Sequence, residues 1–281
     1  MRFSKYHGLG NDYLVIPAAD WSKEFSEAAI RMICHRHYGV GSDGILVGPL
    51  ESTRADFGLR IFNPDGSAAE KSGNGLRIFA RWLVDEGFSN RLAFTVETPG
   101  GVTTCTVRPD RGSVTVKMGK VYFDSALIPV IGNKREVLNE KLVIAGQDLI
   151  ICAATVGNPH CVVLRQQPSA DLARRLGPLI EHHPFFPKRT NVQFMEVLDR
   201  SAILIEIWER GAGYTLASGS SSTAAAAVAR RLGLCDSKIT VHMPGGEQQI
   251  QLDENYMATM SGPVRKVCTG EIAGELFDFL V

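Results

Sequence analysis

The chain has no net charge and no long apolar run, and each absence excludes a kind of protein. Its 281 residues include 30 basic and 30 acidic side chains. Nucleic acids and acidic membranes are normally bound by clustered Lys and Arg, so we expect neither as a partner. No apolar run approaches the roughly 20 residues that span a bilayer, and the first residues, MRFSKYHGLGND, lack the apolar stretch of a signal peptide. We therefore expect a cytoplasmic protein.

Cysteines are few and widely spaced, at positions 34, 105, 152, 161, 235 and 268. With no CxxC pair, this spacing favours neither a zinc ribbon nor a disulfide framework, and most of these residues are expected to be buried. Cys34 with His35 and His37, and His182 with His183, have ligand side chains but not the spacing of a metal site. We expect no metal.

Nucleotide-binding motifs are also lacking. The segment GVGSDG, residues 39–44, matches the letters of the GxGxxG fingerprint, but it follows a predicted helix and leads into an apolar strand. That fingerprint needs a strand before it and a helix after it, so that the pyrophosphate meets a helix N-terminus. No GxxxxGK[ST] loop is present either. We expect no nicotinamide, flavin or other nucleotide cofactor.

The chain does contain an internal repeat. Ser72 and Ser218 are 146 positions apart, as are Ile61 and Ile207, and Asn11 and Asn158 are 147 apart. The paired segments are KSGNGLRIFARWL with ASGSSSTAAAAVARRL, LRIFNPDG with IEIWERGA, and GNDYLVI with GNPHCVVL. A steady offset near half the length indicates a duplicated domain. We predict halves at residues 1–131 and 132–281, and the first half can also take the last strand of the chain.

Apolar periodicity predicts the same order of elements in both halves. Helices are expected over about 24–37, 75–86, 170–180 and 221–232. Strands are expected over 2–5, 13–16, 45–48, 57–62, 151–155, 161–164, 192–197 and 202–208, with further strands closing each half. The last helix is nearly all alanine from Ala224 to Ala229, so it should be buried and closely approached by strands. We expect an α/β fold in which sheet wraps around a helix in each half.

The paired helix starts are the main candidates for a site. Backbone N–H groups at a helix N-terminus, here at Gly73, Asn74, Gly219 and Ser220, favour a negatively charged ligand such as a carboxylate. If the halves face each other, groups at Ser72 and Ser218 approach one substrate atom from two sides. The alternative is that both serines are simple helix caps.

Polar turns supply further candidates. Asparagines stand at predicted element junctions, namely Asn11, Asn63, Asn74, Asn158 and Asn191. Their amides can donate and accept hydrogen bonds, although asparagine is also a common turn residue. Glu209 and Arg210 end a predicted strand and could bind the ammonium and carboxylate of an amino acid. A surface ion pair is the alternative reading of that pair.

These segments together resemble the diaminopimelate epimerase family, and the resemblance covers nearly the whole chain. It rests on FSKYHGLGNDYLVI, HYGVGSDGILVG, FNPDGSAAEKSGNGLRIFARW, TVGNPHCVV, TNVQFMEV and WERGAGYTLASGSSSTAAAAVA. It implies two pseudo-symmetric α/β domains, each a mostly antiparallel sheet around a central helix, with the active site in the cleft between them. It also implies a homodimer that converts LL- to meso-diaminopimelate, a precursor of lysine and peptidoglycan, without pyridoxal phosphate or metal.

The resemblance assigns roles residue by residue. Substrate contacts are implied at Asn11, Asn63, Gly73, Asn74, Asn158, Asn191, Glu209, Arg210, Gly219 and Ser220. His160 and Glu209 stand where the family places groups that adjust the acidity of two catalytic thiols. Gly44 stands where some members carry a glutamine contact, so that contact is in doubt here.

The chain departs from the family at both catalytic cysteines, which are Ser72 and Ser218 here. In the family one thiolate removes the α-proton and the other thiol returns a proton to the opposite face. A serine hydroxyl is far less acidic than a thiol and needs a dedicated base, so the chain as written should be a very poor epimerase.

Several explanations stay open for these serines. The two cysteines were replaced by design, or the chain is a natural racemase or dehydratase with altered chemistry, or it binds an amino acid without catalysis. A serine hydrolase is disfavoured because the sequence has no GxSxG elbow and ties no acidic residue to His160.

Overall fold

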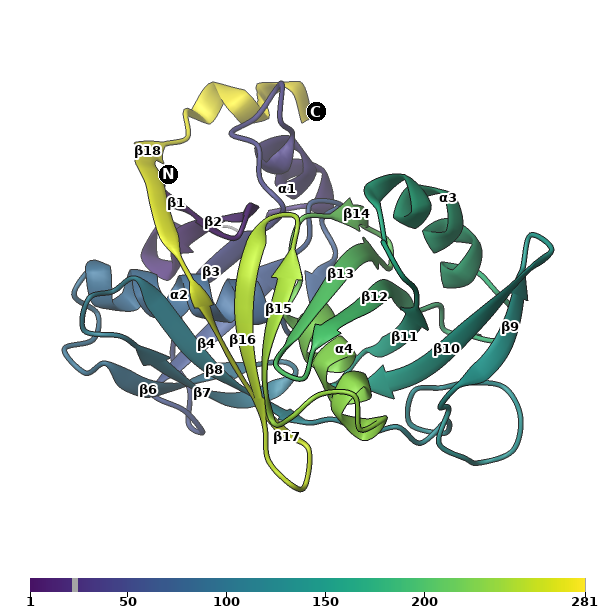
Figure 1. Ribbon diagram of the computed structural model, residues 1–281. Coiled ribbons are helices and arrows are strands. Elements are labelled where there is room, and N and C mark those ends of the chain that lie inside the picture. The colour runs from purple at the N-terminus through teal and green to yellow at the C-terminus, as the bar shows by residue number, and fades with distance from the viewer. Residues whose placement is uncertain (22–24, 281) are drawn as a thin grey trace. The chain divides into compact units, whose positions relative to one another are not determined.

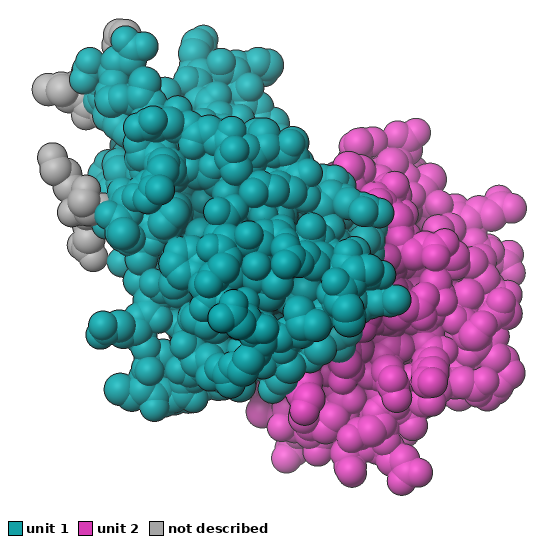
Figure 2. Space-filling view, turned by 90° about the vertical axis from the view of Figure 1, so that its left-hand side faces the viewer, with its two compact units in different colours: residues 1–116, 262–281 teal, residues 117–261 magenta. Residues whose placement is uncertain are grey.

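A computed structural model describes residues 1–21 and 25–280 of the chain (Figure 1). The chain divides into two compact units (Figure 2). Unit 1 comprises residues 1–116 together with those from 262 onward, and unit 2 comprises residues 117–261. Each unit has its own order of strands and its own helices, and is described separately.

In unit 1, strands pair in the order β18, β1, β2, β3, β4, β6, β7, β8, with β5 beside β4. The pairs β2–β3 and β4–β6 are parallel and the others antiparallel. The strand bounds are β1 Arg2–Gly8, β2 Asn11–Pro17, β3 Ile45–Leu50, β4 Phe57–Phe62, β5 Ala68–Ala69, β6 Ala93–Thr98, β7 Gly101–Val107, β8 Ser113–Lys120 and β18 Arg265–Glu271. The helices are α1 Glu27–Cys34 and α2 Gly73–Asp85, with 3₁₀ segments η1 Ala18–Asp20 and η2 Gly274–Leu280.

Unit 2 repeats this topology. Its strands pair in the order β9, β10, β11, β12, β13, β15, β16, β17, with β14 beside β13. The parallel pairs are β11–β12 and β13–β15, at the same two places as in unit 1. The strand bounds are β9 Glu140–Ile144, β10 Gln147–Thr155, β11 Pro159–Leu164, β12 Asn191–Asp199, β13 Ala202–Glu209, β14 Gly213–Thr215, β15 Lys238–Met243, β16 Gly246–Leu252 and β17 Met257–Pro263. The helices are α3 Ala170–Glu181 and α4 Gly219–Arg231.

The matching orders confirm the duplicated α/β fold that the sequence predicts. The C-terminal strand β18 pairs with β1 and so holds in unit 1 the place that β9 holds beside β10 in unit 2. In each unit the sheet is mostly antiparallel, as predicted. A parallel connection needs a crossover element, and in each unit a helix lies between the two strands of each parallel pair.

Helix α2 begins where Ser72 caps it and is buried along nearly its whole length. Its side chains Phe79, Trp82 and Leu83 are at most 1% exposed, and the helix contacts β1, β2, β3 and β7 (Figure 1). It ends at Asp85, and Gly87 follows with φ of 76°, a left-handed conformation that glycine adopts without strain. The sequence predicts this helix two residues late at its start, because the Ser72 cap places Gly73 inside the first turn.

Helix α4 is the equivalent helix of unit 2 and is filled by small side chains. Residues 224–229, which are five alanines and Val228, are all fully buried, and the helix contacts β10, β11, β12, β13, β15 and β16. Alanine lets strands approach closely on several sides, so the prediction of a buried helix surrounded by strands is confirmed. The helix begins at Gly219 rather than at the predicted Ser221, because Ser218 is its cap.

Helices α1 and α3 pack against apolar clusters of their own units. Ile30 and Ile33 of α1 join Leu14, Ile16 and Ile45 of the strands in one buried cluster. The prediction for α1, 24–37, is too long: residue 24 lies outside the described residues, Ser26 caps the helix, and the backbone is extended at residue 35. The cluster under α3 is built in the same way from Leu172, Ala173, Leu176, Ile180, Val192 and Phe194 among others.

The units divide at 116/117, earlier than the predicted boundary at 131/132. Polar residues around position 132 interrupt the apolar pattern, yet Ile128, Val130 and Val137 are buried in the cluster under α3. The backbone of Tyr122 also bridges to Thr155 of β10. The interruption is therefore a loop on unit 2. At the other end of the chain, where strands are predicted to continue, the 3₁₀ segment η2 follows β18.

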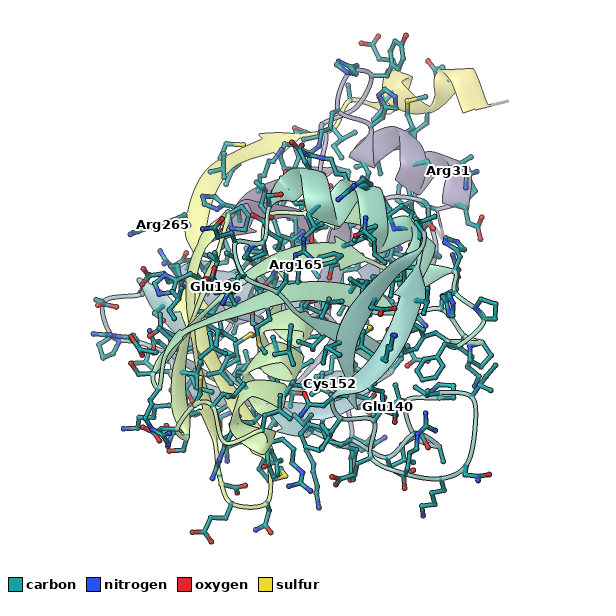
Figure 3. All side chains as sticks on the ribbon, turned by 45° about the vertical axis from the view of Figure 1, so that its right-hand side comes forward. Arg31, Glu140, Cys152, Arg165, Glu196 and Arg265 are labelled. Carbon is teal, nitrogen blue, oxygen red and sulfur yellow. The ribbon has the colours of Figure 1, made fainter. Side chains whose placement is uncertain are left out.

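All six cysteines are free, and five of them are buried as the sequence predicts; Cys268 is exposed. Cys152 illustrates their environment: it lies on β10 near Glu140 of the neighbouring β9 (Figure 3). Its Sγ accepts a hydrogen bond from the Asn139 N–H at 3.3 Å. Burial raises the pKa of the Cys152 thiol, which makes this group an unreactive packing side chain.

Candidate active site

The first half-site is the N-terminus of α2 with the start of β2. Ser72 has an extended backbone, and its Oγ accepts a hydrogen bond from the Gly75 N–H at 3.0 Å. The hydroxyl oxygen of Tyr13, a buried residue of β2, lies 3.1 Å from the same Oγ. Either hydroxyl can be the donor of this second bond. Ser72 is therefore both a helix cap and the partner of a phenol.

Gly44 makes room for the Tyr13 ring. A Cβ at position 44 would lie 2.5 Å from the carbonyl oxygen of Phe62 and 2.7 Å from Cε1 of Tyr13. Both separations are too short for any side chain. With Tyr13 in this position, residue 44 cannot be the glutamine that some family members have there, which gives the departure a physical reason.

An amide network joins the predicted asparagines of this half-site. Asn74 Nδ2 donates to Asn11 Oδ1 at 3.0 Å, and Asn11 Nδ2 donates to Asp43 Oδ2 at 2.9 Å. Arg77 donates to Asn74 Oδ1 at 2.5 Å and to the Pro263 carbonyl at 2.9 Å. Arg77 is fully buried, and this burial lowers its pKa to about 10. These bonds hold the Asn11 and Asn74 amides in one orientation.

Asn63 and Gly73 complete the residues predicted for this half. Asn63 follows β4, and its Nδ2 donates to Ser67 Oγ at 3.0 Å, so it closes the turn before β5. Gly73 is the first residue of α2 and is buried. Next to the cap, burial lowers the pKa of the Lys71 ammonium. N–H groups in the first turn of a helix have no carbonyl one turn back, so this end of α2 favours an anionic ligand.

The second half-site is the N-terminus of α4 with the start of β11. Ser218 Oγ accepts from the Ser221 N–H at 3.4 Å and lies 3.5 Å from Ser220 Oγ. Asn158 Nδ2 lies 3.5 Å from the same Ser220 hydroxyl. Gly219, the first residue of α4, is buried. The structure thus brings Ser218, Gly219, Ser220 and Asn158 together, through longer contacts than those of the first half-site.

His160 is fully buried, and its Nε2 lies 3.0 Å from Asn158 Oδ1. Loss of solvation lowers its pKa to about 3; an interaction with Gln193 opposes this shift, and the charge of Arg210 adds to it. His160 Nδ1 and Gln193 Oε1 are buried atoms that make no hydrogen bond of normal geometry within the described residues. The imidazole is therefore neutral near pH 7 and cannot act there as a cation.

Asn191, Glu209 and Arg210 lie at the ends of neighbouring strands. Asn191 begins β12 beside His160 of β11, and its Oδ1 accepts from the Arg210 N–H at 3.0 Å. Its Nδ2 donates to the Pro159 carbonyl at 2.8 Å. Glu209 is the last residue of β13, and the exposed Arg210 side chain donates to the Lys188 carbonyl. Asn191 thus fixes the backbone that follows Glu209.

Sequence reasoning missed Tyr13 and Arg77. The repeat itself contains a signal for Tyr13: it is 147 positions before His160, in the same place of GNDYLVI and GNPHCVVL. Two aromatic side chains that can carry a proton thus occupy one position of the duplicated unit. No sequence pattern points to Arg77, because an arginine inside an apolar helix pattern normally faces solvent.

Other parts of the molecule are weaker candidates. Within residues 1–21 and 25–280, no group of three or more His, Cys, Asp or Glu could hold a metal ion. The Cys34–His37 segment has internal roles instead: His35 Nδ1 accepts from the His37 and Tyr38 N–H groups. No helix in the described part of the chain is long and apolar enough to cross a membrane.

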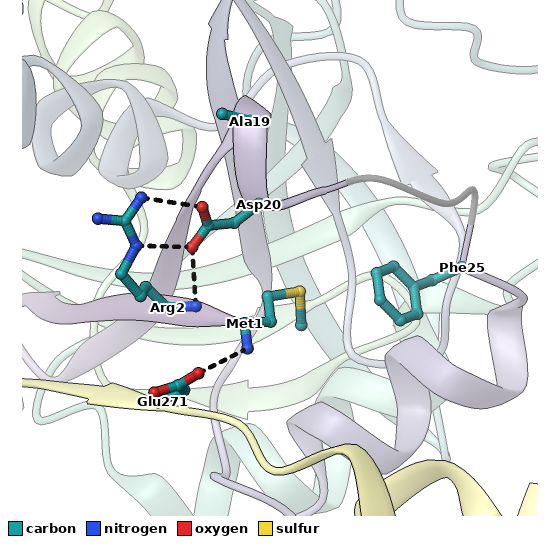
Figure 4. Close-up of a pocket in the computed structure, with 6 residues that line it drawn as sticks. All are labelled: Met1, Arg2, Ala19, Asp20, Phe25 and Glu271. Carbon is teal, nitrogen blue, oxygen red and sulfur yellow. Dashed lines mark hydrogen bonds and ion pairs between the residues drawn. The ribbon is translucent and has the colours of Figure 1, made fainter.

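A pocket in unit 1 lies beside the N-terminal residue (Figure 4). Its lining includes Arg2, which donates to both carboxylate oxygens of Asp20 at 2.9 and 3.0 Å. The Met1 ammonium lies 3.7 Å from Glu271. Because these charges already pair with one another, the two half-sites remain the better candidates.

Comparison with known proteins gives a consistent result. Residues 3–123 and 152–267 match a family model described as diaminopimelate epimerase. Diaminopimelate epimerase 2 of Nostoc sp. (strain PCC 7120) is 57% identical over 277 residues, which are 99% of this chain and 97% of that protein. Diaminopimelate epimerase of Alkaliphilus metalliredigens is 38% identical over 275 residues, 96% of each chain.

Solved structures share the fold at low sequence identity. A hydroxyproline epimerase from Agrobacterium vitis has a TM-score of 0.73 at 16% identity, covering 98% of this chain and 92% of its own. A phenazine biosynthesis protein of the PhzF family from Bacillus anthracis has a TM-score of 0.70 at 17% identity, covering 97% and 99%. At these identities the likeness extends to the fold alone.

Proposed function

Because the chain belongs to the diaminopimelate epimerase family, an isomerase family, we propose that it acts on diaminopimelate or a similar amino acid by proton transfer at the α-carbon. In this proposal Ser72 and Ser218 stand where the family resemblance places its two cysteines. Each would serve one face of the substrate. The reaction is the interconversion of LL- and meso-diaminopimelate, which serves lysine and peptidoglycan synthesis.

The observation that carries the proposal is the equivalence of the two serines. Each is the N-cap of a largely buried helix whose first residue is a buried glycine, and each accepts a bond from the N–H three residues on. A duplicated fold thus presents the same cap twice, once in each unit. Two equivalent groups are what a reaction needs when a proton leaves one face and returns to the other.

The rest of both half-sites suits an amino acid ligand. Helix N-termini attract a carboxylate, and the Asn11, Asn74 and Asn158 amides offer both donors and acceptors. Glu209 would bind or help to deprotonate the substrate ammonium, and the Arg210 cation would bind a carboxylate. The chemistry of these groups uses no cofactor, so we propose that none is needed.

Serine makes the reaction slow. A thiol with an ordinary pKa near 8.5 is readily ionised, whereas an alcohol needs a base to act at all. We therefore propose that the chain binds its substrate but turns it over poorly. A related racemase or dehydratase with altered chemistry, or a protein that binds an amino acid without turnover, would use the same two half-sites.

The test is to replace Ser72 and Ser218 by Cys together and to follow deuterium incorporation at the α-carbon of diaminopimelate in D₂O. We expect the double variant to exchange the α-proton and to interconvert the stereoisomers. A double variant that carries an additional Glu209→Gln change is the matched control and should exchange more slowly. Folded double-Cys protein that catalyses no exchange would contradict the epimerase function.

Calorimetry of the unaltered chain with diaminopimelate separates the remaining alternatives. Heat of binding without any turnover would favour the binding protein, and turnover of another amino acid would favour the divergent racemase or dehydratase. A cytoplasmic location and a homodimer stay predictions, and light scattering of the purified chain tests the dimer.

A further inference from the structure

Tyr13 distinguishes the first half-site from an ordinary helix cap. Resting on the function proposed above, we propose that Tyr13 is the proton-accepting partner of Ser72, and that this pair moves the α-proton on one face of the substrate only. Tyr13 acts through Ser72 and is therefore a positioning and relay residue. Its hydroxyl oxygen is 3.1 Å from Ser72 Oγ, within the range for a hydrogen bond.

The geometry leaves Ser72 able to relay a proton. Its Oγ accepts the Gly75 N–H at 3.0 Å, which supports negative charge on the oxygen during transfer. The helix N-terminus acts in the same direction, because its dipole favours negative charge. With the phenol ionised, the Ser72 hydroxyl becomes the donor of the 3.1 Å bond and Tyr13 the acceptor.

Two protons move together when the α-carbon is deprotonated. The bond between the α-carbon and its hydrogen breaks, and the proton passes to Ser72 Oγ. The Ser72 hydroxyl proton passes at the same time to the phenolate oxygen of Tyr13. The electron pair stays on the α-carbon, where the substrate carboxylate delocalises it. In the reverse step the phenol returns its proton to Ser72, and Ser72 gives its own proton to the carbon. A tyrosine phenol ordinarily titrates near pH 10, far below an aliphatic alcohol, so the pair is a better base than serine alone.

The fold holds the Tyr13 ring in place for this role. Tyr13 is 7% exposed, and Gly44, the residue before β3, leaves the space that its ring fills. Leu14 and Ile45, the next residues along, are partners in the parallel β2–β3 pair. Because the ring and the strand pair are fixed together, the hydroxyl is held within hydrogen-bond distance of Ser72 Oγ.

The second half-site has no equivalent arrangement among the bonds of Ser218. Ser218 Oγ contacts the Ser221 N–H and the Ser220 hydroxyl, and an alcohol is no better a base than Ser218 itself. His160, at the repeat position of Tyr13, lies against Asn158 instead. A proton can therefore leave and return on the Ser72 face far more readily than it can be delivered from Ser218.

This asymmetry predicts a measurable signature. In D₂O the unaltered chain should exchange the α-proton of one diaminopimelate configuration at least about tenfold faster than it epimerises it. Nuclear magnetic resonance follows the exchange, and chiral chromatography follows epimerisation. The exchange rate should rise with pH toward the range where phenols ionise.

Tyr13→Phe should lower this exchange about 100-fold or more, the size of a general-base contribution, and should remove the rise with pH. Binding measured by calorimetry should be unchanged. Tyr38→Phe, which removes the hydroxyl of a 76% exposed tyrosine, is the matched control and should exchange like the unaltered chain. Ser72→Ala keeps the phenol but removes the relay, and should lose exchange to the same extent.

Two results overturn the role of Tyr13: no exchange by the unaltered chain, or equal exchange and an equal pH profile in Tyr13→Phe. The Ser72→Cys/Ser218→Cys variant separates this failure from failure of the proposed function. If that variant exchanges the α-proton, only the Tyr13 role is wrong. If it is folded and inert, the epimerase function is wrong as well.

Discussion

Units 1 and 2 share one topology, but their helix starts differ in chemistry. In unit 1 the aromatic residue before the apolar part of the strand, Tyr13, reaches the capping serine at 3.1 Å. In unit 2 the residue at the same repeat position, His160, turns to Asn158 and is held neutral by burial. A duplicated fold therefore preserves the place of a proton-carrying side chain while allowing each copy a different partner.

The central helices differ in a second way. At equivalent positions of the repeat, α2 carries Phe79 where α4 carries Ala225, and both are fully buried. In unit 1 the helix side chains fill the space inside the sheet. In unit 2 a strand side chain comes up to the small residues of the helix, where Met243 Sδ lies 3.1 Å from Ser222 Oγ of α4. The same topology therefore accepts side chains of different size at equivalent positions of its central helix.

The largest expected effect comes from restoring one thiol at a time. Ser218→Cys should raise α-proton exchange by about 100-fold or more, because a thiol supplies a general base that Ser218 lacks. Ser72→Cys should raise it less, because Tyr13 already acts as the base partner of Ser72. The two variants should act on opposite configurations of the α-carbon, which stereospecific exchange measurements distinguish. If both accelerate exchange of the same configuration, the two serines do not serve opposite faces.

The next effect is the dependence of folding stability on pH that His160 causes. Burial lowers its pKa to about 3, so below about pH 6.5 the unfolded chain binds a proton that the folded chain does not. Above that pH His160 is neutral in both the folded and the unfolded chain and adds no pH dependence. As the pH falls below it, the free energy of unfolding decreases by about 1.4 kcal/mol per pH unit until the folded-state pKa is reached. Urea denaturation from pH 7 to 5 measures this slope.

His160→Gln should remove this contribution to the slope of the free energy of unfolding against pH. Tyr13→Phe should leave the slope unchanged, because a phenol does not titrate between about pH 5 and 7. Equal slopes for His160→Gln and the unaltered chain would show that another group causes the pH dependence.

A smaller effect is expected from enlarging the alanine helix. Ala225→Leu should destabilise the fold by about 1–3 kcal/mol, because extra methyl groups enter a space that strands already fill. Thermal or urea unfolding measures the loss. Arg175→Leu adds leucine at an exposed position of α3 and should change stability by less than about 0.5 kcal/mol. An equal effect of the two changes would contradict the close packing around α4.

The smallest expected effect is the difference in stability between removing the capping hydroxyl of α2 and removing that of α4. Ser72→Ala should cost about 1 kcal/mol of stability, and Ser218→Ala less, because the cap bond is 3.0 Å in α2 and 3.4 Å in α4. Ser26→Ala and Ser169→Ala, which remove the caps of α1 and α3, are matched controls away from the half-sites. A larger loss for Ser218→Ala would reverse the order proposed for the two caps.

Much of the fold could be predicted because it is encoded by local spacing. The offset between Ser72 and Ser218 marks the duplication, and the run from Ala224 to Ala229 marks a buried helix. The predicted ends of helices are less accurate, because a capping hydroxyl decides where a helix begins. Positions 128 and 130 are separated from position 137 by Gly132 and a run of polar residues that looks like a boundary in sequence, and only packing shows that the three belong to one core.

The sequence by itself determined the repeat, the serine at each helix start and the asparagines at the turns, because each follows from residue type and short-range spacing. The tertiary structure alone decided the partners of those groups. Tyr13 and Ser72 are 59 positions apart and meet because α2 packs against β2, and Gly44 leaves room for the ring. A contact of this kind depends on the position of a strand against a helix, which no local pattern records.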